Sequence, residues 1–172
     1  MGTAGDETQS PALAASFPEG AALGELLLVR HLTVAVAESC TGGLLGAAIT
    51  AIPGASGYFL GGVIAYSDQV KRDVLGVDGR TLSRHGAVSR EVALAMASGA
   101  ARRLGADLGL GITGVAGPGA EGTDKPVGLI HVAGWLRGRQ SAVELRQQGD
   151  REANRAAAVR AALRLGADLA VD

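Results

Sequence analysis

The chain has 172 residues, of which 47% are hydrophobic and 19% are charged, and its formal net charge is −1. A chain of this length and balance is predicted to fold as one globular domain with a substantial core. Nucleic-acid binding is not expected, because the sequence has no block of basic residues and few aromatic residues for base stacking. A membrane span is not expected either, since no apolar stretch reaches the length of a transmembrane helix.

The amino-terminal segment and the single cysteine predict the cellular compartment. Residues 1–18 are small, polar and proline-containing, and they lack the basic start and apolar centre of a signal peptide. We therefore predict a disordered tail over 1–18, followed by a single domain over 19–172. One cysteine cannot form an intramolecular disulfide, which fits a reducing compartment and predicts a cytoplasmic protein.

Apolar patterns along the chain predict helices that alternate with strands. The helices are expected over 21–31, 42–51, 67–74, 90–104 and 151–171, with a helical turn at 81–84. The strands are expected over 32–37, 58–66, 108–113, 127–135 and 141–147, with a glycine- and proline-rich loop over 114–126 and a hairpin turn at Arg137-Gly138. This order predicts an α/β fold, namely a three-layer α/β/α sandwich with a mixed, mostly parallel sheet of about five strands.

The segment after the first predicted strand has the character of a chemical site. Ala37-Glu-Ser-Cys-Thr-Gly-Gly43 leads from that strand into a helix, with Ser39 at the bend. Backbone N–H groups at a helix N-terminus favour negative charge, so a hydroxyl at this bend lies beside donors for an oxyanion or a phosphate. The same residues are also typical of an ordinary N-cap and of glycines in a tight turn.

Chemically useful side chains follow the ends of predicted strands. In an open α/β sheet the functional crevice lies beyond the carboxyl ends of the parallel strands, where Ser39, Tyr66 and Thr113 are expected. A serine nucleophile needs a neighbouring base. Lys71, one turn into the helix over 67–74, can reach back to Ser39, provided that burial lowers its pKa enough to leave a neutral amine. A solvated lysine on the helix surface is the alternative interpretation.

The histidines and the cysteine are weaker candidates. His31 is expected at the end of the sheet opposite to Ser39, and His131 lies within a predicted strand. His85 lies in a predicted loop, and no carboxylate lies at a spacing from it that would indicate a catalytic pair. Cys40 is a rival nucleophile, but without a suitably placed histidine it is expected to be a small buried residue. No metal is expected, because the histidines and the cysteine show no ligand spacing. The loop over 113–119 lacks the P-loop pattern and is predicted to contact a substrate.

Several of these segments together resemble one known family. They are Ala37-Glu-Ser-Cys-Thr-Gly-Gly43, Ala65-Tyr-Ser-Asp-Gln-Val-Lys71, His85-Gly-Ala-Val-Ser89, Thr113-Gly-Val-Ala-Gly-Pro-Gly119, Lys125-Pro-Val-Gly128 and Gly149-Asp-Arg151. The chain resembles the CinA C-terminal domain family, whose characterised enzymes are nicotinamide-nucleotide amidohydrolases of the PncC type. The resemblance implies a three-layer α/β/α fold, a homo-oligomer (a dimer), and hydrolysis of nicotinamide mononucleotide to nicotinic acid mononucleotide and ammonia.

The resemblance also implies roles for individual residues. It implies a Ser/Lys mechanism with Ser39 as the nucleophile, Lys71 as its base and Tyr66 as a supporting phenol, and we expect no cofactor. The oxyanion is expected to meet backbone N–H groups of the turn after Ser39. Substrate contacts are expected at Cys40, Thr41, Gly42, Gly43, Thr113, Gly114, Gly117, Arg151 and Arg155. The two arginines are equally typical of solvent-facing helix charges.

Two other functions remain open at this point. A non-catalytic nucleotide-binding or regulatory protein of the competence- or damage-inducible kind would use the same glycine loops, but it would not need Ser39 and Lys71 together. A structural dimerisation domain would need neither feature. Because one fold can carry several functions, the chemistry of the site has to decide between them.

Overall fold

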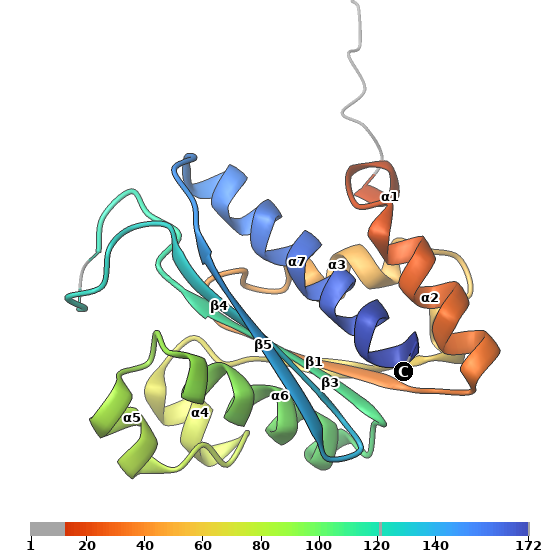
Figure 1. Cartoon of the computed structure of the whole chain (residues 1–172), viewed down its shortest axis with the longest axis horizontal. Helices are drawn as coiled ribbons and strands as arrows, with labels where there is room; N and C mark the ends of the chain where they lie inside the picture. The colour runs from red at the N-terminus through yellow and green to blue at the C-terminus, as the bar shows by residue number, and fades with distance from the viewer. Residues whose placement is uncertain (1–12, 121, 172) are drawn as a thin grey trace, which may run out of the picture.

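A computed structural model of the chain describes residues 13–120 and 122–171 (Figure 1). Its elements are α1 (Leu13–Ser16), α2 (Glu19–Arg30), β1 (Val34–Glu38), α3 (Leu44–Thr50), η1 (Ala55–Gly57), β2 (Phe59–Ile64), α4 (Asp68–Asp73), α5 (Gly79–His85), α6 (Arg90–Leu104), β3 (Leu108–Gly114), β4 (Leu129–Leu136), β5 (Arg139–Arg146) and α7 (Arg151–Val171). Each predicted helix and strand has a counterpart, with bounds that differ by a few residues. Among the helices of these described ranges, none combines the length and apolar character needed to span a membrane.

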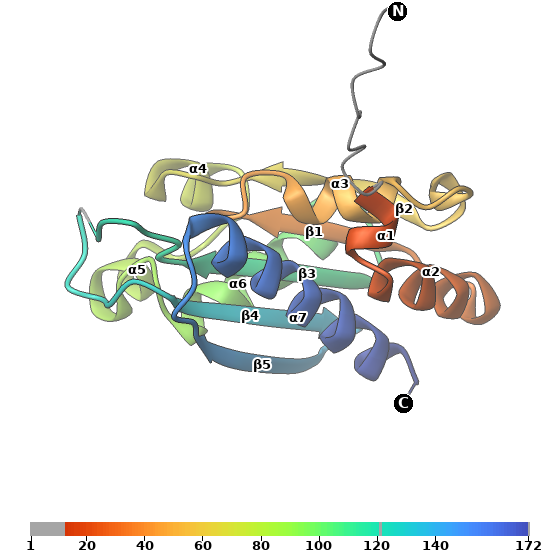
Figure 2. The ribbon, with the colours of Figure 1, turned by 90° about the horizontal axis from the view of Figure 1, so that it is seen from above.

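The strands form one mixed sheet in the order β2-β1-β3-β4-β5. β1 is parallel to β2 and β3, whereas β4 is antiparallel to β3 and β5, so that every strand except β4 runs in one direction. Helices α2, α3 and α7 cover one face of the sheet, and α4, α5 and α6 lie on the other (Figures 1 and 2). The predicted three-layer sandwich is therefore confirmed.

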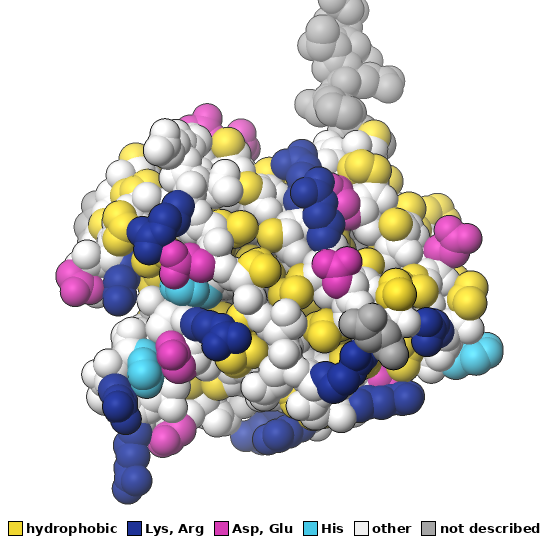
Figure 3. Space-filling view, in the orientation of Figure 1, with side chains coloured by type: hydrophobic (Ala, Val, Ile, Leu, Met, Phe, Trp, Pro, Cys, Tyr) yellow, Lys and Arg dark blue, Asp and Glu magenta, His cyan; other side chains and the backbone are white. Residues whose placement is uncertain are grey.

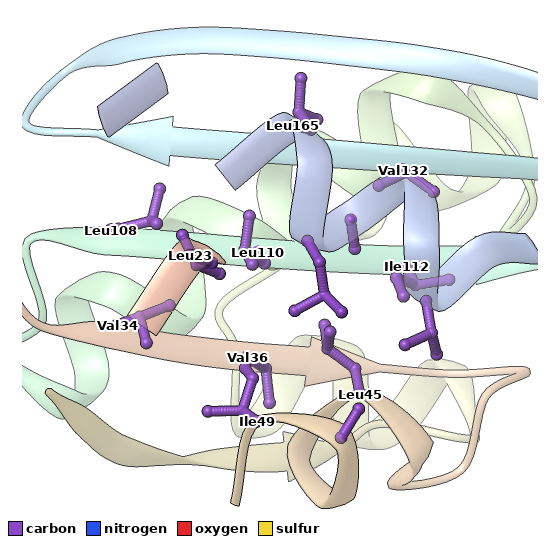
Figure 4. Packing of buried hydrophobic residues seen from close by; sticks show 14 of the residues in the cluster. Leu23, Val34, Val36, Leu45, Ile49, Leu108, Leu110, Ile112, Val132 and Leu165 are labelled. Carbon is purple, nitrogen blue, oxygen red and sulfur yellow. The ribbon is translucent and has the colours of Figure 1, made fainter. Parts of the chain in front are cut away.

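Side chains alternate across β1, so this one strand contributes to the core on both faces of the sheet. Val34 and Val36 belong to the larger cluster, which packs between the sheet and α2, α3 and α7 (Figure 4). Ala35 and Ala37 belong to a second cluster on the α6 side. Both clusters are built mainly from aliphatic residues, as the low aromatic content predicts.

Two glycines of β3 allow α6 to lie very close to the sheet. A Cβ at Gly109 would lie 2.0 Å from the carbonyl oxygen of Ala97, and a Cβ at Gly111 would lie 2.5 Å from that of Ala93. Any side chain at these positions would push the helix away from the strand, because contacts this short are repulsive. The glycines thereby fix α6 against the strand that carries Thr113.

The predicted disordered tail over 1–18 is wrong for its last residues. Leu13–Ser16 form α1, and Phe17 is buried against the main core. The Arg160 guanidinium lies over the Phe17 ring, with its Cζ 5.2 Å from the ring centroid. This packing against α7 supplies the burial that the composition of the segment does not suggest. Residues 1–12 lie outside the described residues.

Candidate active site

The ends of β1, β2 and β3 open into one cavity of ≈ 250 Å³. Ser39, Tyr66 and Thr113 all line it, together with Lys71 and Arg151. Figure 2 shows why they meet there: α4, the start of α7 and the loop after β3 gather at the same end of the sheet. The structure thus brings together the segments that were predicted to converge.

Strand alternation and a helix cap place Ser39 against Lys71. Ser39 follows Ala37 by two residues, so its side chain points to the face that carries α4 and α6. Ser67 caps α4, its hydroxyl accepting a hydrogen bond from the Val70 N–H at 3.2 Å, and Lys71 lies one turn further. The Lys71 Nζ atom lies 3.2 Å from Ser39 Oγ, within hydrogen-bond distance as predicted.

The Lys71 side chain is buried, with 2% of its surface exposed. Its Nζ also lies 3.5 Å from the Tyr66 carbonyl oxygen and 3.7 Å from Asp68 Oδ1. Burial lowers the pKa of Lys71, because desolvation penalises the ammonium, whereas the Asp68 carboxylate acts in the opposite direction and raises it. The expected downward shift of the Lys71 pKa is therefore present, but the opposing effect of Asp68 was not predicted.

Cys40 lines the cavity as a buried thiol. Burial raises its pKa to about 11, so at neutral pH the group remains a thiol rather than the reactive thiolate. This agrees with the expectation of a small buried residue and leaves Ser39 as the better nucleophile of the turn.

The histidines lie outside the cavity. His31 is the C-cap of α2, as expected. His85 is the last residue of α5 rather than part of a loop, and its Nδ1 lies 3.6 Å from Glu91 Oε2. His131 Nε2 lies 4.0 Å from Glu144 Oε2. The last two histidines belong to a surface on which acidic and basic side chains are interspersed (Figure 3), and neither lines the cavity that holds Ser39.

The turn after Ser39 offers fewer free amides than the sequence predicted. Gly42 and Gly43 have φ values of 59° and 104°, so α3 begins at Leu44 rather than at Gly42. The Gly42 N–H donates to the Ser39 carbonyl, and the Gly43 N–H donates to the Glu38 carboxylate at 3.1 Å. The prediction that these two amides are free for an oxyanion is therefore wrong.

The Cys40 amide contacts its own thiol and donates to no other residue within residues 13–120 and 122–171. The Cys40 amide is therefore the donor that this turn can offer to an oxyanion. The Cys40 amide adjoins the cavity, since Cys40 contributes to its lining.

The predicted substrate-binding residues divide into two groups. Those that line the cavity are Cys40, Thr113, Gly114, Gly117 and Arg151, and those that lie outside its lining are Thr41, Gly42, Gly43 and Arg155. Arg155 is not solvent-facing either: its Nη2 donates to the Thr41 carbonyl at 2.7 Å and thereby ties α7 to the serine turn. The Thr113 hydroxyl donates to the Ala87 carbonyl at 2.8 Å, so this hydrogen bond stabilises the wall of the cavity.

Tyr66 and Arg151 form the mouth of the cavity. The Arg151 guanidinium donates to the Gly117 carbonyl at 2.6 Å and to the Tyr66 hydroxyl at 3.3 Å. Tyr66 is 62% exposed, and it contacts Lys71 through its backbone carbonyl rather than through its phenol. The phenol therefore contacts Arg151, not the Ser39–Lys71 pair.

Asn154 is a residue that the sequence reasoning missed. It is buried, and its amide donates to the carbonyls of Ala116 and Gly149, each at 3.0 Å, and accepts from the Gly149 N–H at 3.1 Å. Asn154 thereby joins the cavity loop to the start of α7. A polar residue among the alanines of a helix was the available signal, since it has to find partners once buried.

Comparison with known proteins identifies relatives over most of the chain. The model of the CinA C-terminal domain matches residues 19–169. A protein of Halothermothrix orenii whose name describes it as competence-damage inducible is 53% identical over 134 residues, which are 77% of this chain and 32% of that protein. A CinA-like protein of Gloeobacter violaceus is 54% identical over 121 residues, which are 70% of this chain and 28% of that protein. The chain spans about one third of the length of the curated relatives that it matches.

Solved structures of similar length share the fold. A CinA superfamily protein from Klebsiella pneumoniae aligns with a TM-score of 0.87 and 34% identity, covering 91% of this chain and 98% of that chain. The competence/damage inducible protein CihA from Agrobacterium tumefaciens aligns with a TM-score of 0.79 and 41% identity, covering 86% of this chain and 93% of that chain. The family expected from the sequence motifs is confirmed, and the chain belongs to the CinA C-terminal domain family.

Proposed function

We propose that the chain hydrolyses the carboxamide of nicotinamide mononucleotide, with Ser39 as the nucleophile and Lys71 as its base. The observation that carries the proposal is the contact of 3.2 Å between Ser39 Oγ and the Nζ of a buried lysine. Lysine is almost never fully buried unless it is paired. The carboxylate nearest to Lys71, that of Asp68, lies 3.7 Å away and is largely exposed. A lysine held in this way beside a serine fits a base better than a structural ion pair.

The first half of the proposed reaction forms an acyl-enzyme. Neutral Lys71 accepts the hydroxyl proton of Ser39 while Oγ attacks the carboxamide carbon, which gives a tetrahedral intermediate. The Lys71 ammonium then donates that proton to the amide nitrogen, the C–N bond breaks, and ammonia leaves. The Tyr66 carbonyl and the Asp68 carboxylate stabilise the ammonium between the two proton transfers.

The second half releases the acid. Lys71, neutral again, accepts a proton from a water molecule whose oxygen attacks the ester carbon. The second tetrahedral intermediate collapses with return of the proton to Ser39 Oγ, and nicotinic acid mononucleotide leaves. In both halves the amide of Cys40, which adjoins the cavity, is the donor assigned to the oxyanion, and such a donor is worth roughly 10²–10³-fold in rate in serine hydrolases.

The anionic end of the substrate is assigned to Arg151. Its guanidinium lies at the mouth of the cavity and uses two of its donors on Gly117 and Tyr66. Because a guanidinium has five N–H donors, others remain for a phosphate. The helix N-terminus of α3, in contrast, is already filled by the Glu38 carboxylate.

The proposal is tested by incubating the purified chain with nicotinamide mononucleotide and measuring ammonia together with the mass of the nucleotide product. We expect one ammonia for each nicotinic acid mononucleotide formed, and much less turnover of free nicotinamide, which lacks the phosphate. Binding of the nucleotide without release of ammonia would replace the amidohydrolase with the non-catalytic nucleotide-binding protein. Absence of both binding and turnover would reject this substrate.

A further inference from the structure

Glu38 is a buried carboxylate for which the proposed reaction has no use. It is the last residue of β1, and 1% of its surface is exposed. Its Oε2 accepts hydrogen bonds from the N–H groups of Gly43 at 3.1 Å and Leu45 at 3.0 Å, and its Oε1 accepts one from Gly46 at 2.8 Å. The Glu38 carboxylate therefore takes the place of an N-cap side chain, which Gly43 at the start of α3 cannot supply.

Glu38 and Ser39 are neighbours whose side chains serve opposite faces of the sheet. The Glu38 carboxylate binds α3 on one face, whereas Ser39 Oγ meets Lys71 on the other. Their backbone is held on both sides, because the Ala65 N–H donates to the Glu38 carbonyl at 2.7 Å and the Ser39 N–H donates to the Ile112 carbonyl at 3.0 Å. A single peptide, held in the sheet on both sides, therefore joins the Glu38 anchor on α3 to the Ser39 side chain in the cavity.

We propose that Glu38 is a positioning residue for the Ser39 nucleophile, an inference that rests on the proposed function. By binding the first turn of α3, its carboxylate fixes the turn after Ser39, so that Oγ stays within reach of Lys71 and the Cys40 amide stays available for the oxyanion. A negative charge suits this place, since it complements the positive end of the helix dipole and makes charge-assisted hydrogen bonds.

Glu38→Gln and Glu38→Ala test the proposal with a conservative and a more severe change of the Glu38 side chain. Gln keeps the shape, but its NH₂ group faces a backbone N–H that needs an acceptor. Ala removes the carboxylate and leaves a space that formate can occupy. Asp107→Asn is the matched control, because Asp107 also accepts a backbone hydrogen bond, from Thr33 at 2.9 Å, but at the opposite end of β1.

The principal measurement does not depend on nicotinamide mononucleotide. An alkyl fluorophosphonate, which phosphonylates reactive serines as an O–P bond forms and fluoride leaves, is added to the folded chain, and the rate of Ser39 modification is followed by intact mass. We expect both Glu38 variants to be modified more slowly, by about 10²-fold, which is the usual cost of a nucleophile displaced by about 1 Å. The kcat for ammonia release should fall in parallel with less change in KM, and formate should restore part of the rate in Glu38→Ala.

The Asp107→Asn control distinguishes a loss of Ser39 positioning from a loss of protein stability. Asp107→Asn is expected to lower the melting temperature while Ser39 modification keeps its wild-type rate. Wild-type modification rates in folded Glu38→Gln and Glu38→Ala, or a loss in Glu38→Ala that formate does not restore, would overturn the proposal.

The outcomes also separate this inference from the proposed function. A wild-type chain that is modified rapidly at Ser39 in a Glu38-dependent manner but releases no ammonia would reject the amidase and retain the positioning role. A wild-type chain that is not modified at Ser39 and releases no ammonia would reject both.

Discussion

The pKa of Lys71 is set by two opposed effects, and Asp68→Asn separates them. Burial lowers this pKa, and the Asp68 carboxylate, 3.7 Å from Nζ, raises it. Two unit charges about 4 Å apart interact by about 1 kcal/mol in water and by about 4 kcal/mol at an effective dielectric constant of about 20. Asp68 is 61% exposed, so the lower end of this range applies. The Asp68 carboxylate therefore favours the ammonium modestly and raises the Lys71 pKa, against the larger effect of burial.

The direction in which the pH–rate profile shifts follows from the role of Lys71 as a base. A base acts when it is unprotonated, so kcat/KM should rise with pH through the Lys71 pKa. Removing the Asp68 charge destabilises the ammonium, lowers this pKa further, and is expected to move the rising limb of the pH–rate profile toward acid. The measurement is ammonia release across the pH range in which the proteins stay folded.

Asp73→Asn is the matched control for this prediction, because Asp73 is an exposed acidic residue on the same helix. It removes the same charge without a contact to Lys71 Nζ, and the limb should stay in place. A limb that does not move in Asp68→Asn, or that moves toward alkaline pH, would refute the reasoning.

Further substitutions test the other assignments. Ser39→Ala should lower ammonia release by on the order of 10⁴-fold or more while calorimetry still detects nucleotide binding; near wild-type turnover would contradict the serine mechanism. Cys40→Ser should remain active in the same assay, because burial raises the pKa of the thiol to about 11 and the thiolate is scarce; a folded, inactive variant would restore the thiol as a candidate. Tyr66→Phe should lower kcat in steady-state kinetics by about tenfold or less, because Lys71 contacts the Tyr66 carbonyl and the phenol bonds only to Arg151 among the described residues. A loss as large as that of Ser39→Ala would indicate that the Tyr66 phenol takes part in proton transfer.

Local sequence patterns predicted most of the fold, because the signals act over a few residues. The buried run that forms β1 and the Ser67 cap of α4 are both visible without knowledge of the tertiary structure. The three-layer arrangement then follows from the alternation of strands and helices, whereas the place of β1 between β2 and β3 was not predicted and comes from the structure. Phe17 escaped prediction, since its burial depends on α7, whose residues lie far along the chain.

The candidate site was predictable to the extent that it depends on strand ends. The rule that parallel strands end at one edge brought Ser39 and Thr113 together, and helical spacing brought Lys71 to them. Glu38 and Asn154 were missed, because a buried polar side chain finds its partners only in the folded structure. The sequence indicated a free helix N-terminus at α3, whereas the adjacent Glu38 fills it.

The central claim is that Lys71 acts as a base and not merely as a positive charge. Lys71→Arg keeps the charge on a side chain of similar length, but a guanidinium does not release its proton near neutral pH. The decisive measurement is kcat for ammonia release from nicotinamide mononucleotide by Lys71→Arg, with folding verified by circular dichroism. A fall to the level of Ser39→Ala is the predicted result, and substantial turnover by folded Lys71→Arg would contradict the Ser39–Lys71 mechanism.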